Sequence, residues 1–478
     1  MKKLNYKILI SLVILCLSLD INAQTLTGYF MNYTTNGNMY NPVFNPKSKV
    51  YVSLYDIHIN AGNSAFSINN IFKNINNGEK YVIDLDKIYG NLKKKNYIFT
   101  NQEISLANFG FRINEGYVNG GISIKSNLNM SYPKDIFKLK DGTYFGENST
   151  IDLSGINLKA NLYYEFKLGY SWEYSDKISL GVNLKRIQNI ANFRTKKCDI
   201  EFETNGDMYN IDLKSNIEAE FSCNTDLKFA KNENGLIDSV YSDNINIDDL
   251  NNDNIKDLLK GKNGGWATDL GITYKINNKI SLAGSIIDLG FIRCKKNAKS
   301  LTQSGNFKFE GIDIAKYLNN IDTVGEILKD SILAYASPND NDKGYTDFLN
   351  TKIYISGMYE LNKYIKFGCV FRGMWYSKTF HPSLTSSVNF TIGNETQISI
   401  SQSFINRKAN VFGFGISQRL GYVQLHFILD QLSPALWAMK DGKIADKWIR
   451  NTNMISFQTG LSVIIGRKYY NENGYYDY

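Results

Sequence analysis

The sequence predicts an all-β fold, a transmembrane antiparallel β-barrel of about 14 strands, with a plug-like N-terminal segment and short helices in its loops. Three observations favour this fold. Apolar and polar residues alternate over long runs, short turn sequences separate the runs, and the 478 residues include 32 tyrosines and 27 phenylalanines but only 6 prolines. The mean hydropathy of −0.30 does not exclude such a barrel, because its lumen face stays polar.

Residues 156–174 show this alternation, with polar side chains between apolar ones. The apolar positions are Ile156, Leu158, Ala160, Leu162, Tyr164, Phe166, Leu168, Tyr170, Trp172 and Tyr174. At roughly 3.3 Å per residue this strand is on the order of 60 Å long, whereas strands of soluble domains usually have about 5 to 6 residues. Alternate side chains point to opposite faces. We therefore expect Leu162 and Phe166 to meet lipid, and Asn161 and Glu165 to face the lumen.

Residues 1–23 have the features of a cleaved secretory signal. Lysines precede an apolar stretch at residues 8–19, and Ala23 offers a small residue for cleavage. The stretch is too short to span a membrane comfortably, so an uncleaved anchor is the weaker alternative. Cleavage lowers the net charge from +8 to +6, because it removes Lys2, Lys3, Lys7 and Asp20. An exported barrel is expected in the outer membrane of a Gram-negative bacterium.

Hairpins with the same alternation follow along the chain. They occupy residues 177–187, 269–290, 353–376, 395–432 and 453–470. A turn at Asn277-Asn278 joins two of these strands, and a short turn "SD" precedes the first. Counting all candidate runs gives about 14 to 16 strands, and an even number is expected of a bacterial barrel.

Three segments interrupt the alternation. Residues 225–264 are rich in Asn and Asp and predict a long loop with a short helical stretch. Residues 312–349 carry apolar side chains at helical spacing and predict an amphipathic helix pair. Those side chains are Ile314, Tyr317, Leu318, Ile321, Val324, Leu328 and Ile332.

The third interruption is the stretch from Thr25 to Lys95, which is poor in strands. It contains "NPVFNP" at 41–46 and a predicted helix in "DLDKIYGNLKKK". We expect it to lie in the lumen as a plug or across the periplasmic mouth. The predicted organisation is therefore a signal at 1–23, a plug or mouth segment with the first strand at 24–97, and the barrel at 98–478.

Charge and motif patterns give no support for an enzyme. Basic residues are spread along the strands without a block of one sign, so nucleic-acid binding is not expected. No G-x-G-x-x-G arrangement precedes a helix, so no cofactor site is predicted. The histidines lie far apart in the sequence, at His58, His381 and His426. We expect no catalytic or metal site, and a structural, hydrogen-bonded role for the lumen-facing His426.

Four cysteines remain after signal cleavage, and their wide separation matches neither a metal site nor a small disulfide framework. They are Cys198, Cys223, Cys294 and Cys369. Free thiols are expected, with a bridge between Cys198 and Cys223 as the alternative.

Four stretches carry a resemblance to a known family. They are "NPVFNPKSKVYVSLYDIHINAGNSAFSINNIF", "SIIDLGFIRCKK", "ILKDSILAYA" and "SFINRKANVFGFGISQRLGYVQLHFILDQL". The chain resembles an uncharacterised domain-of-unknown-function family of Gram-negative outer-membrane barrels. That family is distantly similar to the long-chain fatty-acid transporter barrels and to the barrel of the type IX secretion attachment complex. The resemblance implies a fourteen-stranded barrel but no particular substrate.

Two membrane functions and one soluble alternative fit these features. The preferred function is the passage or binding of a hydrophobic small molecule by a barrel surrounded by lipid and lipopolysaccharide. A scaffold without transport is the second possibility, because surface loops at 225–264 and 436–450 offer contacts for a protein partner. The second loop bears Trp437, Met439 and Trp448. A soluble exported β-protein is the third, and it would need a second sheet over each face.

Overall fold

The computed structural model describes most of the chain from Leu26 onward. The described residues are 26–31, 34–65, 72–75, 80–83, 85–141, 149–204, 211–223, 227–231, 237–242, 263–309, 339–376, 379–393, 395–405, 408–430, 454–466, 468–471 and 474–477. The predicted signal at 1–23 and the loop at 436–450 lie outside them, as do residues 312–338 of the helix pair predicted at 312–349 and most of the loop at 225–264.

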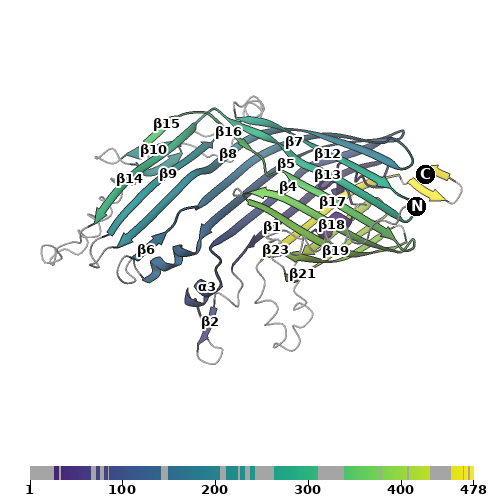
Figure 1. Cartoon of the computed structure of the whole chain (residues 1–478). Coiled ribbons are helices and arrows are strands. Elements are labelled where there is room, and N and C mark those ends of the chain that lie inside the picture. Colours follow the sequence, from purple (N-terminus) through teal and green to yellow (C-terminus); the bar gives the residue numbers. More distant parts are fainter. Residues whose placement is uncertain are drawn as a thin grey trace.

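A closed antiparallel ring of 14 strands forms the body of the protein, which confirms the predicted fold class (Figure 1). The ring closes because β1 pairs with both β23 and β4. Its order is β1 (Val50–Asn63), β4 (Lys95–Ile113), β5 (Gly116–Pro133), β7 (Asn157–Glu173), β8 (Ile178–Thr204), β12 (Gly264–Lys275), β13 (Ile280–Cys294), β17 (Lys352–Glu360), β18 (Ile365–Tyr376), β19 (Thr379–Ile392), β20 (Thr396–Ile405), β21 (Lys408–Leu420), β22 (Val423–Asp430) and β23 (Met454–Ile465). The predicted boundary between residues 97 and 98 falls inside β4.

Short turns lie at the end of the ring where β1 begins and β23 ends, and asparagines hold two of them. In the turn from β12 to β13, Asn277 Oδ1 accepts hydrogen bonds from the backbone N–H groups of Lys279 and Ile280, at 2.8 and 2.9 Å. Asn362 does the same in the turn from β17 to β18. The Asn side chain thus replaces a backbone acceptor, which is why it suits such turns.

At the opposite end, part of the sheet extends beyond the ring (Figure 1). β8 pairs with β12 over its first half and with β9 (Ile211–Cys223) over its second half. β9 then pairs with β14 (Ala298–Phe309), and β14 with β15 (Asn339–Asp342). β6 (Ser149–Asp152) joins the end of β8, and β16 (Tyr345–Phe348) joins the end of β13. We call β6, β9, β14, β15 and the second half of β8 the extension.

Strands β15 and β16 correct one expectation from the sequence. Residues 339–348 belong to the stretch predicted as an amphipathic helix pair, but they pair as strands with β14 and β13. Contacts with strands distant in the sequence decide their conformation, and local periodicity does not record such contacts.

Short helices and hairpins make up the remaining described structure. The helices are the 3₁₀ turns η1 (Thr27–Phe30), η2 (Gly37–Met39) and η4 (Lys134–Asp141), and α3 (Leu85–Asn91), where a helix was predicted. The hairpins are β2 (Phe72–Ile75) with β3 (Lys80–Ile83), β10 (Leu227–Lys231) with β11 (Ile237–Ser242), and β24 (Lys468–Asn471) with β25 (Gly474–Asp477). Figure 1 shows α3 and β2 outside the ring, at the end opposite β24 and β25.

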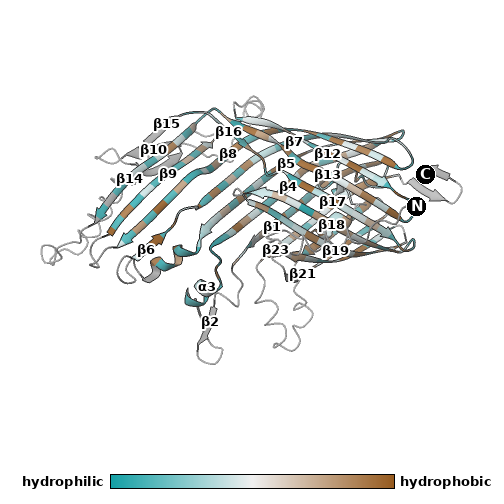
Figure 2. Ribbon diagram, in the orientation of Figure 1, coloured by the Kyte–Doolittle hydropathy of each residue, from teal (hydrophilic) through white to brown (hydrophobic). Residues whose placement is uncertain are grey.

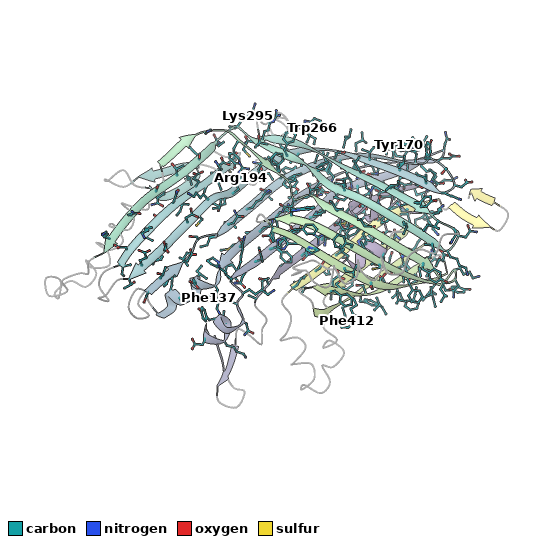
Figure 3. All side chains as sticks on the ribbon, in the orientation of Figure 1. Phe137, Tyr170, Arg194, Trp266, Lys295 and Phe412 are labelled. Atoms are coloured by element: carbon teal, nitrogen blue, oxygen red, sulfur yellow. The ribbon has the colours of Figure 1, made fainter. Side chains whose placement is uncertain are left out.

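The ring has its polar side chains inside and its apolar side chains outside. Leu168, Leu184 and Ile355 are 61%, 58% and 61% exposed on the outer face, whereas Asn161 and Glu165 are buried. Figure 2 shows hydrophobic and hydrophilic residues alternating along the strands, and Figure 3 shows side chains such as Tyr170 and Trp266 projecting outward. The register predicted for residues 156–174 is therefore present in β7. Among the described residues, no helix has the length and apolar character to span a membrane.

Substitutions on the two faces of β7 test this register. Leu162→Arg places a charge on the apolar outer face and should destabilise a barrel in lipid by about 2 to 4 kcal/mol near the bilayer midplane. Asn161→Arg, one residue away on the lumen face, should cost much less. Urea unfolding in phospholipid vesicles measures both. Equal losses would show that the outer face does not meet lipid.

Candidate functional site

Residues 26–31 and 34–49, called the plug below, lie inside the ring at the end with the short turns. The plug has no strand, and its own backbone hydrogen bonds come mainly from the turns of η1 and η2. Most of its residues are buried, and its few aromatic side chains form too small a cluster to bury them all. The ring wall must therefore provide its packing partners.

Polar side chains of the plug bond to inward-facing side chains all around the ring. Thr27 contacts Asp430 of β22 and lies 2.5 Å from Ser401 Oγ of β20. On other strands, Tyr29 pairs with Ser356, Thr35 with Ser462 and Asn45 with Ser171, at 2.8, 2.7 and 2.5 Å between their polar atoms. Further contacts join Asn36 to His426, Tyr40 to Gln458 and Lys167 to Asn38. The plug is thus docked on the wall from many directions.

The motif "NPVFNP" fixes one side of the plug to β12 and β13. The Asn41 amide donates to the backbone carbonyls of Gly284 and Ile272, at 3.2 and 3.5 Å. Its Oδ1 accepts from the N–H of Val43 at 3.0 Å, which forms a local turn. Pro42 lies so close to the wall that a Cβ on Gly181 would be 2.8 Å from its carbonyl carbon. Glycine is required there for the close approach of plug and strand.

An apolar cluster joins the plug to a different part of the wall. Leu26, Tyr29, Phe30 and Tyr40 pack with three wall residues, Ile287, Tyr354 and Val370. The rings of Tyr29 and Tyr354 stack with centroids 5.6 Å apart. Burial raises the pKa of Tyr29 and Tyr40 above the usual value, so both phenols stay neutral and pack as apolar rings. This cluster gives the plug its hydrophobic anchor.

Above the plug, a row of charged side chains runs across seven neighbouring strands, and we call it the charged belt. Its members are Glu103 of β4, Lys125 of β5, Glu165 of β7, Lys185 of β8, Asp269 of β12, Asp288 of β13 and Lys352 of β17. Lys125 Nζ lies 3.4 Å from Glu103 and 2.9 Å from Glu165. Lys185 Nζ lies 2.8 Å from Asp269 and 2.6 Å from Asp288. Each belt lysine therefore has at least one carboxylate partner.

The backbone of Asp288 adapts to this network. Its φ angle of 60° lies in the left-handed region, which is uncommon outside glycine. The Asp288 N–H donates to Asp269 Oδ1 at 2.8 Å, and its carboxylate accepts from Lys185 and Lys352 at 2.6 and 2.9 Å. Three charged contacts thus accompany the strained backbone conformation.

A cavity of about 60 Å³ lies between the charged belt and the plug. The plug contributes Leu26, Met39 and Tyr40 to its wall. The remaining lining is largely polar and includes His58, Asn60, Asn101, Asn127, Lys167 and all seven residues of the belt. This cavity is the candidate binding site.

The three histidines lie apart from one another: His58 lines the cavity, whereas His426 and His381 make structural contacts. His426 Nε2 lies 3.2 Å from Asp56 Oδ2 and 3.2 Å from Asn36 of the plug. His381 stacks on Tyr376, with ring centroids 3.5 Å apart. No group of three or more His, Cys, Asp or Glu suited to a metal ion occurs within the described part of the chain.

The four cysteines outside the predicted signal are free. The alternative bridge between Cys198 and Cys223 is wrong, because the two residues occupy distant positions on β8 and β9. Cys198 lies opposite Ile217, whereas Cys223 lies opposite Ala191. Seven positions along β8 correspond to roughly 20 Å, far beyond the reach of a disulfide.

The charged belt was not predicted from the sequence, although a signal for it exists. Glu165, Lys185 and Asp269 each stand at an inward position of an alternating strand, where most neighbours are small or uncharged. A charge at such a position must find a partner inside the lumen. Which partner it finds depends on the strand order, and the sequence does not give that order directly.

Comparison with protein families decides the classification. The model of a family of unknown function, DUF5723, matches residues 42–430. The chain belongs to this family. The match confirms the resemblance predicted from the sequence. No curated protein matches the chain.

Solved structures similar to this DUF5723 chain include two toluene transporters and a FadL homologue. The Ralstonia pickettii toluene transporter TbuX is 8% identical, with 90% of this chain and 92% of that chain covered and a TM-score of 0.39. The Pseudomonas putida toluene transporter TodX is 8% identical, with 90% and 92% covered and a TM-score of 0.37. A Pseudomonas aeruginosa FadL homologue is 9% identical, with 88% and 91% covered and a TM-score of 0.34.

Truncation of one plug side chain tests its apolar anchor. Phe30 is 1% exposed, and Phe30→Ala should destabilise the folded protein by about 3 to 5 kcal/mol, because it removes a buried ring and leaves a hole. Phe348→Ala is the control, since that ring is 68% exposed, and it should change the stability by less than about 1 kcal/mol. Urea unfolding measures both. A negligible effect of Phe30→Ala would contradict the packing described above.

Proposed function

We propose that this protein is an integral outer-membrane barrel that passes a small molecule through a lumen closed at rest by the plug. The observation that carries the proposal is a folded plug inside a ring whose inner face is mainly polar and whose outer face is apolar. The membrane part of the proposal is supported by the outer face. A ring closed on itself leaves no unpaired strand edge, and its exposed apolar side chains suit lipid.

The way in which the plug is held supports a gate. All hydrogen bonds that close the ring run between strands, so the ring does not need the plug for its backbone pairing. Apart from the apolar cluster around Tyr354, the plug is held on the wall by separate hydrogen bonds, most of them between neutral groups and each contributing about 0.5 to 1.5 kcal/mol. Such contacts can be exchanged for water when the plug moves. The covalent link at Lys49 to β1 keeps the plug attached.

For a hydrophobic cargo, the class expected from the sequence, the described lumen offers an apolar surface next to the plug. Ile287, Tyr354 and Val370 form it, and the plug side chains cover it. A hydrophobic molecule would compete with Tyr29 and Phe30 for this surface. Passage of such a molecule therefore requires the plug to withdraw.

A scaffold without transport is the second candidate function, and the extension favours it. β9 and β14 stand beyond the ring and enlarge the surface at the end opposite the short turns. A partner protein would find a broad sheet there. The two functions differ in one observable property, since a scaffold has no need of a lumen that opens when the plug is removed.

The first test of the proposal is localisation. The protein should fractionate with the outer membrane, resist extraction by carbonate and show heat-modifiable mobility in gels, because its strands face lipid. A soluble periplasmic protein of known location is the control. Recovery in the soluble fraction would instead support the exported β-protein.

Removal of the plug tests the gate. A variant lacking residues 28–48 should fold and conduct ions in planar bilayers, whereas the intact protein should be nearly silent. The reason is width, since about 8 strands already form a barrel filled by side chains and 14 strands leave more space. Phe348→Ala, which leaves the plug intact, is the matched control. Equal conductance with and without the plug would favour the scaffold.

A further inference from the structure

We propose that the cavity between the charged belt and the plug binds a small zwitterion of the size of a free amino acid. The inference rests on the proposed function, because the cavity lies in the lumen that the plug closes. Three independent properties of the cavity support it: its charge balance, its unpaired polar atoms and its size.

The charges around the cavity balance. Its lining includes the carboxylates Glu103, Glu165, Asp269 and Asp288, and the ammonium groups Lys125, Lys167, Lys185 and Lys352. A molecule with net charge would disturb this balance in a buried site, where uncompensated charge is costly. A net-neutral molecule would not. A zwitterion can also use both signs of the wall, which an uncharged molecule cannot do.

One donor and one acceptor of opposite charge stand available on the same strand. Lys167 Nζ donates to Asn38 Oδ1 of the plug at 2.9 Å, and among the described residues it forms no ion pair. Glu165 Oε1 lies 2.9 Å from Lys125 Nζ, whereas Glu165 Oε2 has no hydrogen-bond partner and lies 3.7 Å from Lys185 Nζ. Both residues line the cavity from β7, two positions apart, so their Cα atoms are roughly 6 to 7 Å from each other. A carboxylate at Lys167 and an ammonium at Glu165 fit this spacing.

A second unpaired set lies on β1 and β4. Asn60 and Asn101 are directly opposite each other in the register, and both line the cavity. Asn60 Oδ1 and Asn101 Nδ2 are buried and have no hydrogen-bond partner. Asn60 is 1% exposed, so bulk water does not reach it. Other buried amides of the described residues also lack a partner, but among them only Asn60 and Asn101 line the cavity, where their free atoms would accept from an ammonium and donate to a carboxylate.

The size of the cavity limits the ligand. A site of about 60 Å³ has room for roughly four to six water molecules, by the measure in which one water needs about 10 to 15 Å³. Glycine and alanine have a similar number of non-hydrogen atoms. A larger solute would have to displace Met39 or Tyr40 of the plug.

Binding to the intact protein in detergent tests the inference. Isothermal titration calorimetry with glycine should show saturable binding, whereas acetate, methylammonium and toluene should each bind at least fivefold more weakly. Acetate and methylammonium carry the two halves of the zwitterion separately, and toluene has neither. Tighter or equal binding of any of these three probes would overturn the proposal, as would the absence of glycine binding.

Variants of the intact chain locate the site. Lys167→Met removes the ammonium but breaks no ion pair of the described residues, so it should fold, as judged by heat-modifiable mobility. It should weaken glycine binding on the order of 10- to 100-fold, the usual effect of losing a hydrogen bond to a charged group. Asn101→Leu should also weaken glycine binding. Lys214→Met, on the exposed part of the extension, is the control and should leave glycine binding unchanged. Unchanged binding in Lys167→Met would overturn the proposed site.

The inference and the proposed function fail in different experiments. If the intact protein does not bind glycine but the plug-deleted variant conducts, the zwitterion site is wrong and the gated barrel stands. If the intact protein binds glycine but the plug-deleted variant does not conduct, the site stands and the transport function is wrong.

Discussion

The polarity of the lumen is the constraint on which the rest of the structure depends. Alternating strands in a closed ring send every second side chain inward, and in this protein most of those side chains carry hydroxyls, amides or charges. A ring of 14 strands is too wide for these side chains to meet across it and satisfy one another. Two structural features provide partners for these side chains, namely the charged belt along the wall and the plug across the lumen.

The belt and the plug provide partners for different kinds of side chain. The belt pairs charges with charges between neighbouring strands, as Lys125 does with Glu103 and Glu165. The plug brings backbone and neutral polar side chains to hydroxyls such as Ser401 and Ser462. Its aromatic rings cover the apolar wall around Tyr354. The cavity lies between the charged belt and the plug, and its lining includes the unpaired amide atoms of Asn60 and Asn101.

The strands could be predicted from the sequence because they depend on a local pattern. A period of two residues decides which face of β7 carries Asn161 and Glu165. Asn277 marks the turn from β12 to β13, because its side chain accepts a hydrogen bond from a backbone N–H of the same turn. The contact partners of the side chains and strands could not be predicted in this way. The contact of Asn41 with Gly284 joins residues far apart in the chain, and it exists only once the ring has closed. The same reason explains the failure at residues 339–348, whose strands depend on partners in β13 and β14.

Lys167 lies beside the charged belt and also contacts the plug, and this has a consequence for any ligand of the cavity. Its ammonium donates to Asn38 of the plug and also lines the cavity. A ligand that draws this ammonium toward itself weakens one contact between plug and wall. By thermodynamic linkage, a displaced plug changes the affinity for that ligand by the same factor as the ligand changes the equilibrium of the plug. Occupancy of the cavity and closure of the lumen are therefore coupled through one side chain of β7, whose inward position is set by the alternation of residues 156–174.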